Sequence, residues 1–131
     1  MFNAAQEAAF LFISVQNRMS FPSLIITSKS LTPEGAFAEA QARYLDPDPA
    51  AVDQLEALLS ETRTGIVAHF YMDVELQGTL SALTWPHVYI ADSLMMADAA
   101  VNMAKAGVSQ ILVLGVDFMS ENVRAVMDAS G

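Results

Sequence analysis

The pattern of hydrophobic and polar positions changes near residue 65. Beyond it, apolar runs of strand length cover residues 65–71, 86–91 and 110–115. Continuous apolar runs of this length are typical of strands that are buried on both faces of a parallel sheet. Stretches with helical spacing alternate with them, near residues 73–83, 93–106 and 119–129. The alternation predicts an α/β fold, a three-layer αβα Rossmann-like domain with a parallel sheet in the order βαβαβα.

The chain before residue 65 is predicted to be mostly helical. Residues 3–18 carry apolar side chains at helical spacing and predict an N-terminal helix, whereas residues 23–27 predict a short extended segment. Thr32 can cap a helix and Pro33 suits the first helical position. We therefore expect a helix from Thr32 to about residue 44, so that N-terminal helices precede the αβα domain.

A proline-rich stretch at residues 46–49 predicts a turn, because a residue before proline is pushed away from helical angles. A further amphipathic helix is expected after it, with one apolar face formed by Val52, Leu55, Leu58 and Leu59. These patterns divide the chain into an N-terminal helix at 1–20, a helical lead-in at 21–62 and the αβα domain at 63–131.

Composition and charge exclude several classes of partner. The chain is 53% hydrophobic and 16% charged, which predicts a sheet covered on both faces or surface that further protein covers. Its net charge is −9, and its six Lys and Arg residues are scattered singly. Nucleic acids and anionic membranes both need a clustered basic face, so we expect neither as a partner. No apolar run approaches the roughly 18–20 residues of a membrane-spanning helix.

The chain contains no cysteine. Disulfides and thiolate ligation of a metal or an iron–sulfur cluster are therefore excluded within this chain. Residues 1–20 lack the basic region and the small-residue cleavage site of a secretory signal, and no transit peptide is recognisable there.

Polar residues follow each predicted strand, at the edge where open α/β sheets bind ligands. His69 and Tyr71 are two residues apart, so we expect both side chains on the same side of the strand. His69 could act as an acid/base or bind an anion, and Tyr71 could donate a proton. A core histidine bonded to a carbonyl, with a tyrosine packed beside it, would explain the same residues.

Asp92 and Ser93 open the helix that is expected after the second strand. Both residue types are preferred helix caps, so capping alone can explain one of them. The Ser93 hydroxyl and the free amides of the helix start could also hold a carboxylate or a phosphate. After the third strand, Ser120 and Glu121 suit the first turn of a helix. None of these loops carries a GxGxxG or Walker motif, so no nucleotide is indicated.

Three blocks of sequence, taken in order, carry a specific resemblance. GIVAHFYMDVELQG, HVYIADSLMMADAAVNMAKAG and ILVLGVDFMSENVRAVMD resemble the first αβα domain of quinolinate synthases of the plant and algal type. The upstream FPSLIITSKSLTPEGAFAEAQARYLDPD resembles the lead-in of the plant and algal versions. The first 18 residues resemble, weakly, the end of the SufE-like domain that precedes this point in plant forms.

The resemblance implies an enzyme of NAD biosynthesis that condenses iminoaspartate with dihydroxyacetone phosphate to quinolinate, releasing phosphate and water. It implies three similar αβα domains around one site, each supplying one Cys to a [4Fe–4S] cluster whose open iron is a Lewis acid. By matching motifs, His69 and Ser93 are iminoaspartate-binding residues, and Tyr71 is a catalytic acid/base or a triose-phosphate contact. His69 is also a catalytic candidate, with Asp92 and Glu121 as supporting residues.

The chain departs from the family pattern after the last predicted helix. Family members carry their first cluster Cys in the loop that follows, but this chain stops at Gly131 without a Cys or the second and third domains. We expect an N-terminal fragment that holds no metal and is inactive alone, from a plastid protein by resemblance, otherwise a cytoplasmic one. Two other interpretations stay open: a non-catalytic interaction module, and a generic αβα domain that binds a small phosphate ester.

Overall fold

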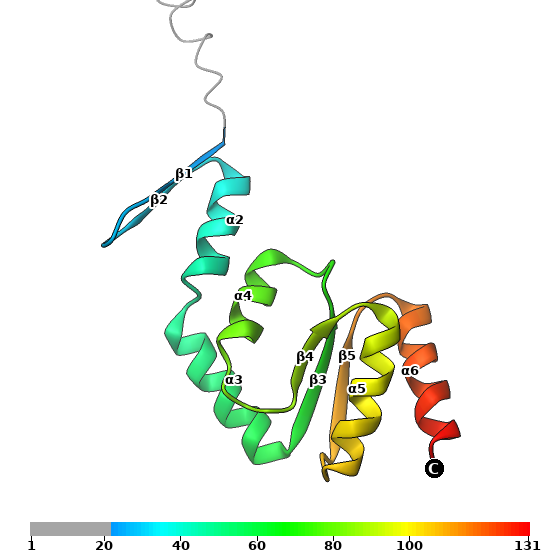
Figure 1. Ribbon diagram of the computed structural model, residues 1–131. Helices are drawn as coiled ribbons and strands as arrows, with labels where there is room; N and C mark the ends of the chain where they lie inside the picture. Colours follow the sequence, from blue (N-terminus) through cyan, green and yellow to red (C-terminus); the bar gives the residue numbers. More distant parts are fainter. Residues whose placement is uncertain (1–21) are drawn as a thin grey trace, which may run out of the picture. The chain divides into compact units, whose positions relative to one another are not determined.

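The computed structural model describes residues 22–131 and is drawn in Figure 1. The chain divides after Glu39 into two compact units, and this boundary lies within helix α2 (Ala36–Leu45). The helix predicted at residues 3–18 lies outside the described residues. Among residues 22–131, no helix is both long and apolar enough to cross a membrane.

The described part of the first unit contains a β-hairpin. Strand β1 (Ser23–Ile26) pairs antiparallel with β2 (Leu31–Glu34), and Leu24 lies opposite Pro33. The sequence-based prediction of a helix start at Thr32 is therefore wrong, because Thr32 and Pro33 belong to β2. A two-stranded hairpin has only edge strands, where a proline without an N–H is tolerated. The helix begins after Gly35, whose φ of +89° suits glycine.

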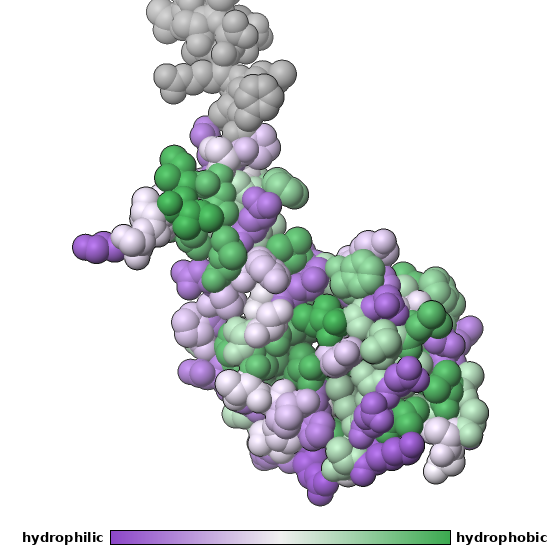
Figure 2. Space-filling model, in the orientation of Figure 1, coloured by the Kyte–Doolittle hydropathy of each residue, from purple (hydrophilic) through white to green (hydrophobic). Residues whose placement is uncertain are grey.

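Large apolar side chains are exposed in this first unit. Ile25 is 59% exposed, Ile26 62% and Phe37 66%. Figure 2 shows hydrophobic surface gathered on this part of the chain, next to the polar tip of the hairpin.

The second unit is an α/β domain around a parallel sheet of three strands in the order β4-β3-β5. This confirms the predicted fold class and the predicted order of elements. Strand β3 ends at His69, two residues earlier than the apolar run suggested. The elements after α2 are α3 (Pro49–Thr62), β3 (Thr64–His69), α4 (Val74–Ala82), β4 (Val88–Ala91), α5 (Ser93–Lys105), β5 (Gln110–Leu114) and α6 (Asp117–Ala129).

Helices cover both faces of the sheet, as Figure 1 shows, and each face has its own buried cluster. Val67 of β3 packs with residues of α5 and α6, including Met96 and Val123. Its neighbours Ile66 and Ala68 point to the opposite face, where they pack with α3 and α4. This alternation within one strand confirms the three layers, because successive strand residues face opposite sides.

Helix α3 begins at Pro49, the last residue of the predicted turn, with Asp48 as its cap: the Asp48 Oδ1 accepts from the Ala50 amide at 3.0 Å. Its apolar face differs from the prediction at one position. Leu59 is 3% exposed, but Leu58 is 55% exposed. Successive helical residues are rotated by about 100°, so Leu58 lies beside the stripe that Leu55 and Leu59 form rather than on it.

Two residues in the left-handed conformation connect the C-terminal ends of α3 and α5. Arg63 ends α3 with a φ of 52°, and Gly107 follows the end of α5 with a φ of +86°. The Arg63 guanidinium donates to the Gly107 carbonyl oxygen, and the Arg63 carbonyl oxygen accepts from the Ser109 amide at 2.8 Å. Trp85 Nε1 donates to the Thr64 carbonyl oxygen at 2.9 Å, which fixes the start of β3.

Candidate functional site

The carboxyl ends of the three parallel strands meet at one edge of the sheet. His69 lies opposite Ala91 of β4, and Ala68 lies opposite Leu114 of β5. The residues that follow His69, Ala91 and Leu114 therefore begin at neighbouring positions along this edge. The structure thus brings together the three strand ends that the sequence singled out.

His69 is the last residue of β3 and is 6% exposed. Its Nδ1 accepts a hydrogen bond from the Tyr71 backbone amide at 3.2 Å. An imidazole nitrogen that accepts carries no proton, so neutral His69 carries its proton on Nε2. Nε2 has no hydrogen-bond partner among the described residues. His69 therefore presents an available Nε2–H donor.

Tyr71 lies in a turn after β3 and is 82% exposed. The expectation that it continues the strand is wrong, because the chain turns where the Met72 amide donates to the His69 carbonyl oxygen at 3.0 Å. Tyr71 nevertheless lies beside the imidazole: the two ring centroids are 4.8 Å apart. Phe70 stacks on the same imidazole at 4.6 Å. The exposure of Tyr71 excludes the alternative in which its ring packs in the core.

Asp92 is the cap of α5. Its Oδ1 accepts from the amides of Leu94 at 2.9 Å and Met95 at 3.0 Å. Asp92 therefore occupies two of the helix-start amides, which is compatible with a ligand contact at Ser93. Ser93 is half-buried, and its hydroxyl has no hydrogen bond with other described residues. The Ser93 hydroxyl therefore remains available to a ligand.

Glu121 is exposed, and its carboxylate makes no hydrogen bond within residues 22–131. Helix α6 begins at Asp117, two residues earlier than predicted, so Glu121 lies beyond the first turn. The neighbouring residue Asn122 points back to the site instead, where its Nδ2 donates to the Ser93 carbonyl oxygen at 3.4 Å. Nothing in these contacts brings Glu121 to His69 or Ser93.

Plant proteins named quinolinate synthase, chloroplastic, are similar to most of this chain. A protein of Nicotiana tabacum is 60% identical over 113 residues, and one of Arabidopsis thaliana is 57% identical over 113 residues. One of Oryza sativa subsp. japonica is 55% identical over 114 residues. The chain is homologous to a segment of the plant quinolinate synthases.

The matched segment covers 85% of this chain but only 16% of each quinolinate synthase. No family model matches the chain, and no solved structure matches it.

The iron–sulfur cluster implied by the resemblance does not fit the residues of this segment. The sequence has no cysteine, and the described residues contain no group of three His, Asp or Glu side chains that could hold a metal. Iron–sulfur clusters are held by thiolates. The described residues of this chain therefore contain no ligand set of this kind.

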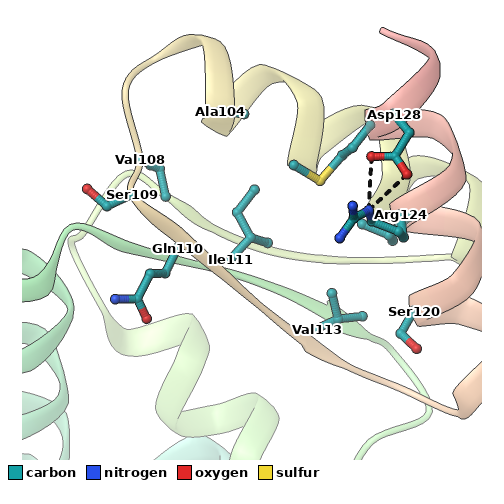
Figure 3. Close-up of a pocket in the computed structure, with 11 residues that line it drawn as sticks. Ala104, Val108, Ser109, Gln110, Ile111, Val113, Ser120, Arg124 and Asp128 are labelled. Carbon is teal, nitrogen blue, oxygen red and sulfur yellow. Dashed lines mark hydrogen bonds and ion pairs between the residues drawn. The ribbon is translucent and has the colours of Figure 1, made fainter. Parts of the chain in front are cut away.

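A groove of about 340 Å³ lies between β5 and α6, away from the three strand ends (Figure 3). Ile111 and Val113 of β5 line it, and the Arg124–Asp128 ion pair of α6 lies at its side, with an N···O distance of 2.9 Å. That pairing raises the pKa of Arg124. His69, Tyr71 and Ser93 are not among the lining residues, so the groove and the strand-end site are separate.

Sequence reasoning missed the residue that holds the turn of Tyr71. Gln77 of α4 donates from Nε2 to the Phe70 carbonyl oxygen at 2.9 Å and to the Met72 carbonyl oxygen at 2.7 Å. A signal was present, since Gln77 is a polar residue between Leu76 and Gly78, on a helix that packs against the sheet. Its target is the backbone of a turn whose shape the local sequence does not reveal.

Proposed function

We propose that this chain is one part of a quinolinate synthase, an enzyme of de novo NAD biosynthesis that condenses iminoaspartate with dihydroxyacetone phosphate. The observation that carries the proposal is the 55–60% identity to plant quinolinate synthases over 85% of the chain. The convergence of His69 and Ser93 at one edge of the sheet supports it, because this edge is where open α/β sheets bind ligands.

In this proposal His69 binds a carboxylate of iminoaspartate through Nε2–H, since Nδ1 is already occupied by the Tyr71 amide. Ser93 donates a second hydrogen bond from its hydroxyl. Asp92 supports this arrangement by capping α5. Because its carboxylate repels a second anion, the bound carboxylate lies on the Ser93 side of the helix start. Tyr71, exposed beside His69, serves as the acid/base or contacts the triose phosphate.

The rest of the enzyme completes the site. Apolar side chains next to the strand ends are strongly exposed: Tyr71 82%, Leu94 75% and Phe118 63%. Exposed apolar surface of this kind is typical of an interface with other protein. We propose that the second and third αβα domains cover it and supply the cysteines of the [4Fe–4S] cluster, which provides Lewis acidity when bound. The names of the relatives support a location in the plastid.

The same exposed surface favours a second candidate, a non-catalytic module that docks on related domains through this edge. The two candidates differ in whether the residues of this chain support turnover. A generic phosphate-ester domain is less well supported, because Asp92 already occupies the Leu94 and Met95 amides at the start of α5.

Exchange of the matched segment tests the proposal. In the tobacco enzyme, the segment that is 60% identical is replaced by that of this chain, and quinolinate formation is measured. We expect activity within about tenfold of the parent, which corresponds to about 1.4 kcal/mol of transition-state stabilisation. The same exchange with His69→Ala should lose at least about a hundredfold. A folded, cluster-containing exchange protein without quinolinate formation would overturn the proposal and favour the docking module.

A further inference from the structure

One side chain holds the turn of Tyr71 from outside the turn. Gln77 is half-buried on α4, and its Nε2 donates to the carbonyl oxygens of Phe70 and Met72, at 2.9 and 2.7 Å. A primary amide has two N–H donors, and here both bind the carbonyl groups on either side of Tyr71. Because both partners are acceptors, only the nitrogen end of the amide fits this position.

Tyr71 itself does little to fix the turn, since its side chain is 82% exposed. The turn depends on backbone hydrogen bonds. The Tyr71 amide donates to His69 Nδ1 at 3.2 Å, and the Met72 amide donates to the His69 carbonyl oxygen at 3.0 Å. Gln77 adds two bonds from a neighbouring helix, and these bonds are the shortest of the four.

The position of Gln77 is fixed by the packing of helix α4. The backbone amide of Gln77 donates to the Asp73 carbonyl oxygen at 3.0 Å. The Asp73 side chain caps α4 by accepting from the Glu75 backbone amide at 2.9 Å. The next residue, Gly78, lies so close to the backbone of Tyr44 that a Cβ would be 2.6 Å from the Tyr44 Cα. One turn later, Leu80 is 2% exposed within the core. The turn is therefore tied to a tightly packed helix.

We infer that Gln77 is a positioning residue, which keeps the Tyr71 amide on His69 Nδ1 and so fixes the tautomer that presents Nε2–H. Without the Gln77 bonds the turn can move, and Nδ1 loses its donor. The proton can then occupy either nitrogen, and the orientation of Tyr71 is no longer set. The effect on catalysis rests on the proposed function, whereas the effect on the tautomer does not.

Two substitutions test this inference in the whole 131-residue chain. Gln77→Glu keeps the size but turns a carboxylate toward two carbonyl oxygens. Gln77→Met keeps the length and the helix propensity, removes both donors and adds no charge. Gln54→Glu is the matched control for charge, because Gln54 is an exposed residue of α3 without a hydrogen bond to other described side chains.

The readouts are hydrogen exchange of backbone amides and the ¹⁵N shifts of the His69 imidazole, which separate the two tautomers. We expect the Tyr71 amide to exchange at least about tenfold faster in both Gln77 variants, from the loss of two hydrogen bonds. The imidazole should move away from a pure Nε2–H tautomer. The amides of Val67 and Ala68 in β3 should keep their exchange rates, and the Gln54 control should behave as wild type.

Unchanged Tyr71 exchange and an unchanged His69 tautomer in Gln77→Met would overturn the inference. In the exchange protein with the tobacco enzyme, Gln77→Met should lower kcat/KM about tenfold with a thermal midpoint near that of the control. A changed tautomer with unchanged kcat/KM would refute the catalytic consequence. An exchange protein that makes no quinolinate even with Gln77 present refutes the proposed function, and the positioning role is then decided by the tautomer alone.

Discussion

The guanidinium of Arg63 donates to the carbonyl oxygen of Gly107, and both residues adopt the left-handed conformation at the C-terminal end of a helix. One contact thus joins the C-terminal ends of α3 and α5, which lie on opposite faces of the sheet. The contact fixes the point where the chain enters β3 and approaches β5. Two layers of the fold are therefore tied together by residues that belong to neither buried cluster.

Gly107→Ala should destabilise the chain. The φ of +86° is unfavourable for alanine, and a Cβ would lie 2.8 Å from Arg63 Nη2. The left-handed conformation alone costs about 1–2 kcal/mol, or roughly 3–8 °C in the thermal midpoint. Thermal unfolding followed by circular dichroism measures the shift. Gly131→Ala is the control for the conformation, since Gly131 has a φ of +82° but nothing within 4 Å; equal shifts in the two variants would show that the contact with Arg63 adds nothing.

Gly78→Ala should also destabilise, although this exchange within a helix normally stabilises by about 0.5–1 kcal/mol. The added Cβ would lie 2.6 Å from the Tyr44 Cα and 2.8 Å from the Tyr44 carbonyl oxygen. Backbone atoms cannot move aside cheaply, so we expect a loss of about 1–3 kcal/mol. Urea unfolding measures it, and a more stable variant would show that α4 does not pack against Tyr44 this closely.

Asp92 and Ser93 should respond differently to replacement by alanine. Asp92→Ala removes the α5 cap and should cost about 1 kcal/mol of stability. Ser93→Ala leaves the cap intact, so the free energy of unfolding should change by less than about 0.5 kcal/mol. In the exchange protein, Ser93→Ala should raise KM for the iminoaspartate substrate about five- to tenfold through one lost hydrogen bond. A loss of stability in Ser93→Ala, with little change in Asp92→Ala, would mean that Ser93 is the cap.

Glu56 should make part of the stability dependent on pH. Its side chain accepts from the Thr84 hydroxyl at 2.5 Å and from the Thr84 amide at 2.8 Å. The hydroxyl bond is the largest cause that lowers the pKa of Glu56 below 4.5 in the folded chain. A lowered folded pKa means that this contribution is present above pH 4.5 and is lost as the pH falls through the folded value.

Thr84→Ala removes the hydroxyl and tests this dependence. The thermal midpoint of the variant should lie below that of wild type at pH 7, and the two should approach each other as the pH falls below 4.5. Thr79→Ala is a suitable control, because the Thr79 hydroxyl donates to the Glu75 carbonyl oxygen and has no other partner within residues 22–131. A difference between wild type and Thr84→Ala that is constant with pH would exclude Glu56 as the titrating partner.

The sequence predicted the sheet and its helices because these signals are local and repeat. Residues 65–71, 86–91 and 110–115 are apolar runs of strand length, and each overlaps a strand. The hairpin could not be predicted in this way. Thr32 and Pro33 match the local signature of a helix start, and pairing with Leu24 and Ile25, about eight residues away, decides their conformation.

The meeting of the three strand ends was predictable, but the hydrogen bonds around them were not. Strand ends of a parallel sheet meet at one edge, and this placed His69 and Ser93 near each other. Which groups remain available depends on hydrogen bonds between segments, such as those of Gln77 with the turn of Tyr71. The side chain that caps α5 could likewise not be chosen from sequence, because Asp92 and Ser93 both suit that position.

The capping of α5 by Asp92 also bears on selectivity. The Asp92 carboxylate accepts from the Leu94 and Met95 amides and neutralises the positive end of the helix dipole. A ligand at Ser93 is therefore held by hydrogen bonds rather than by the charge of the helix dipole. Inorganic sulfate and phosphate, which bind uncapped helix starts through charge, gain little there. Recognition at this edge should consequently depend on the shape and the hydrogen-bonding geometry of the ligand, and should vary only weakly with ionic strength.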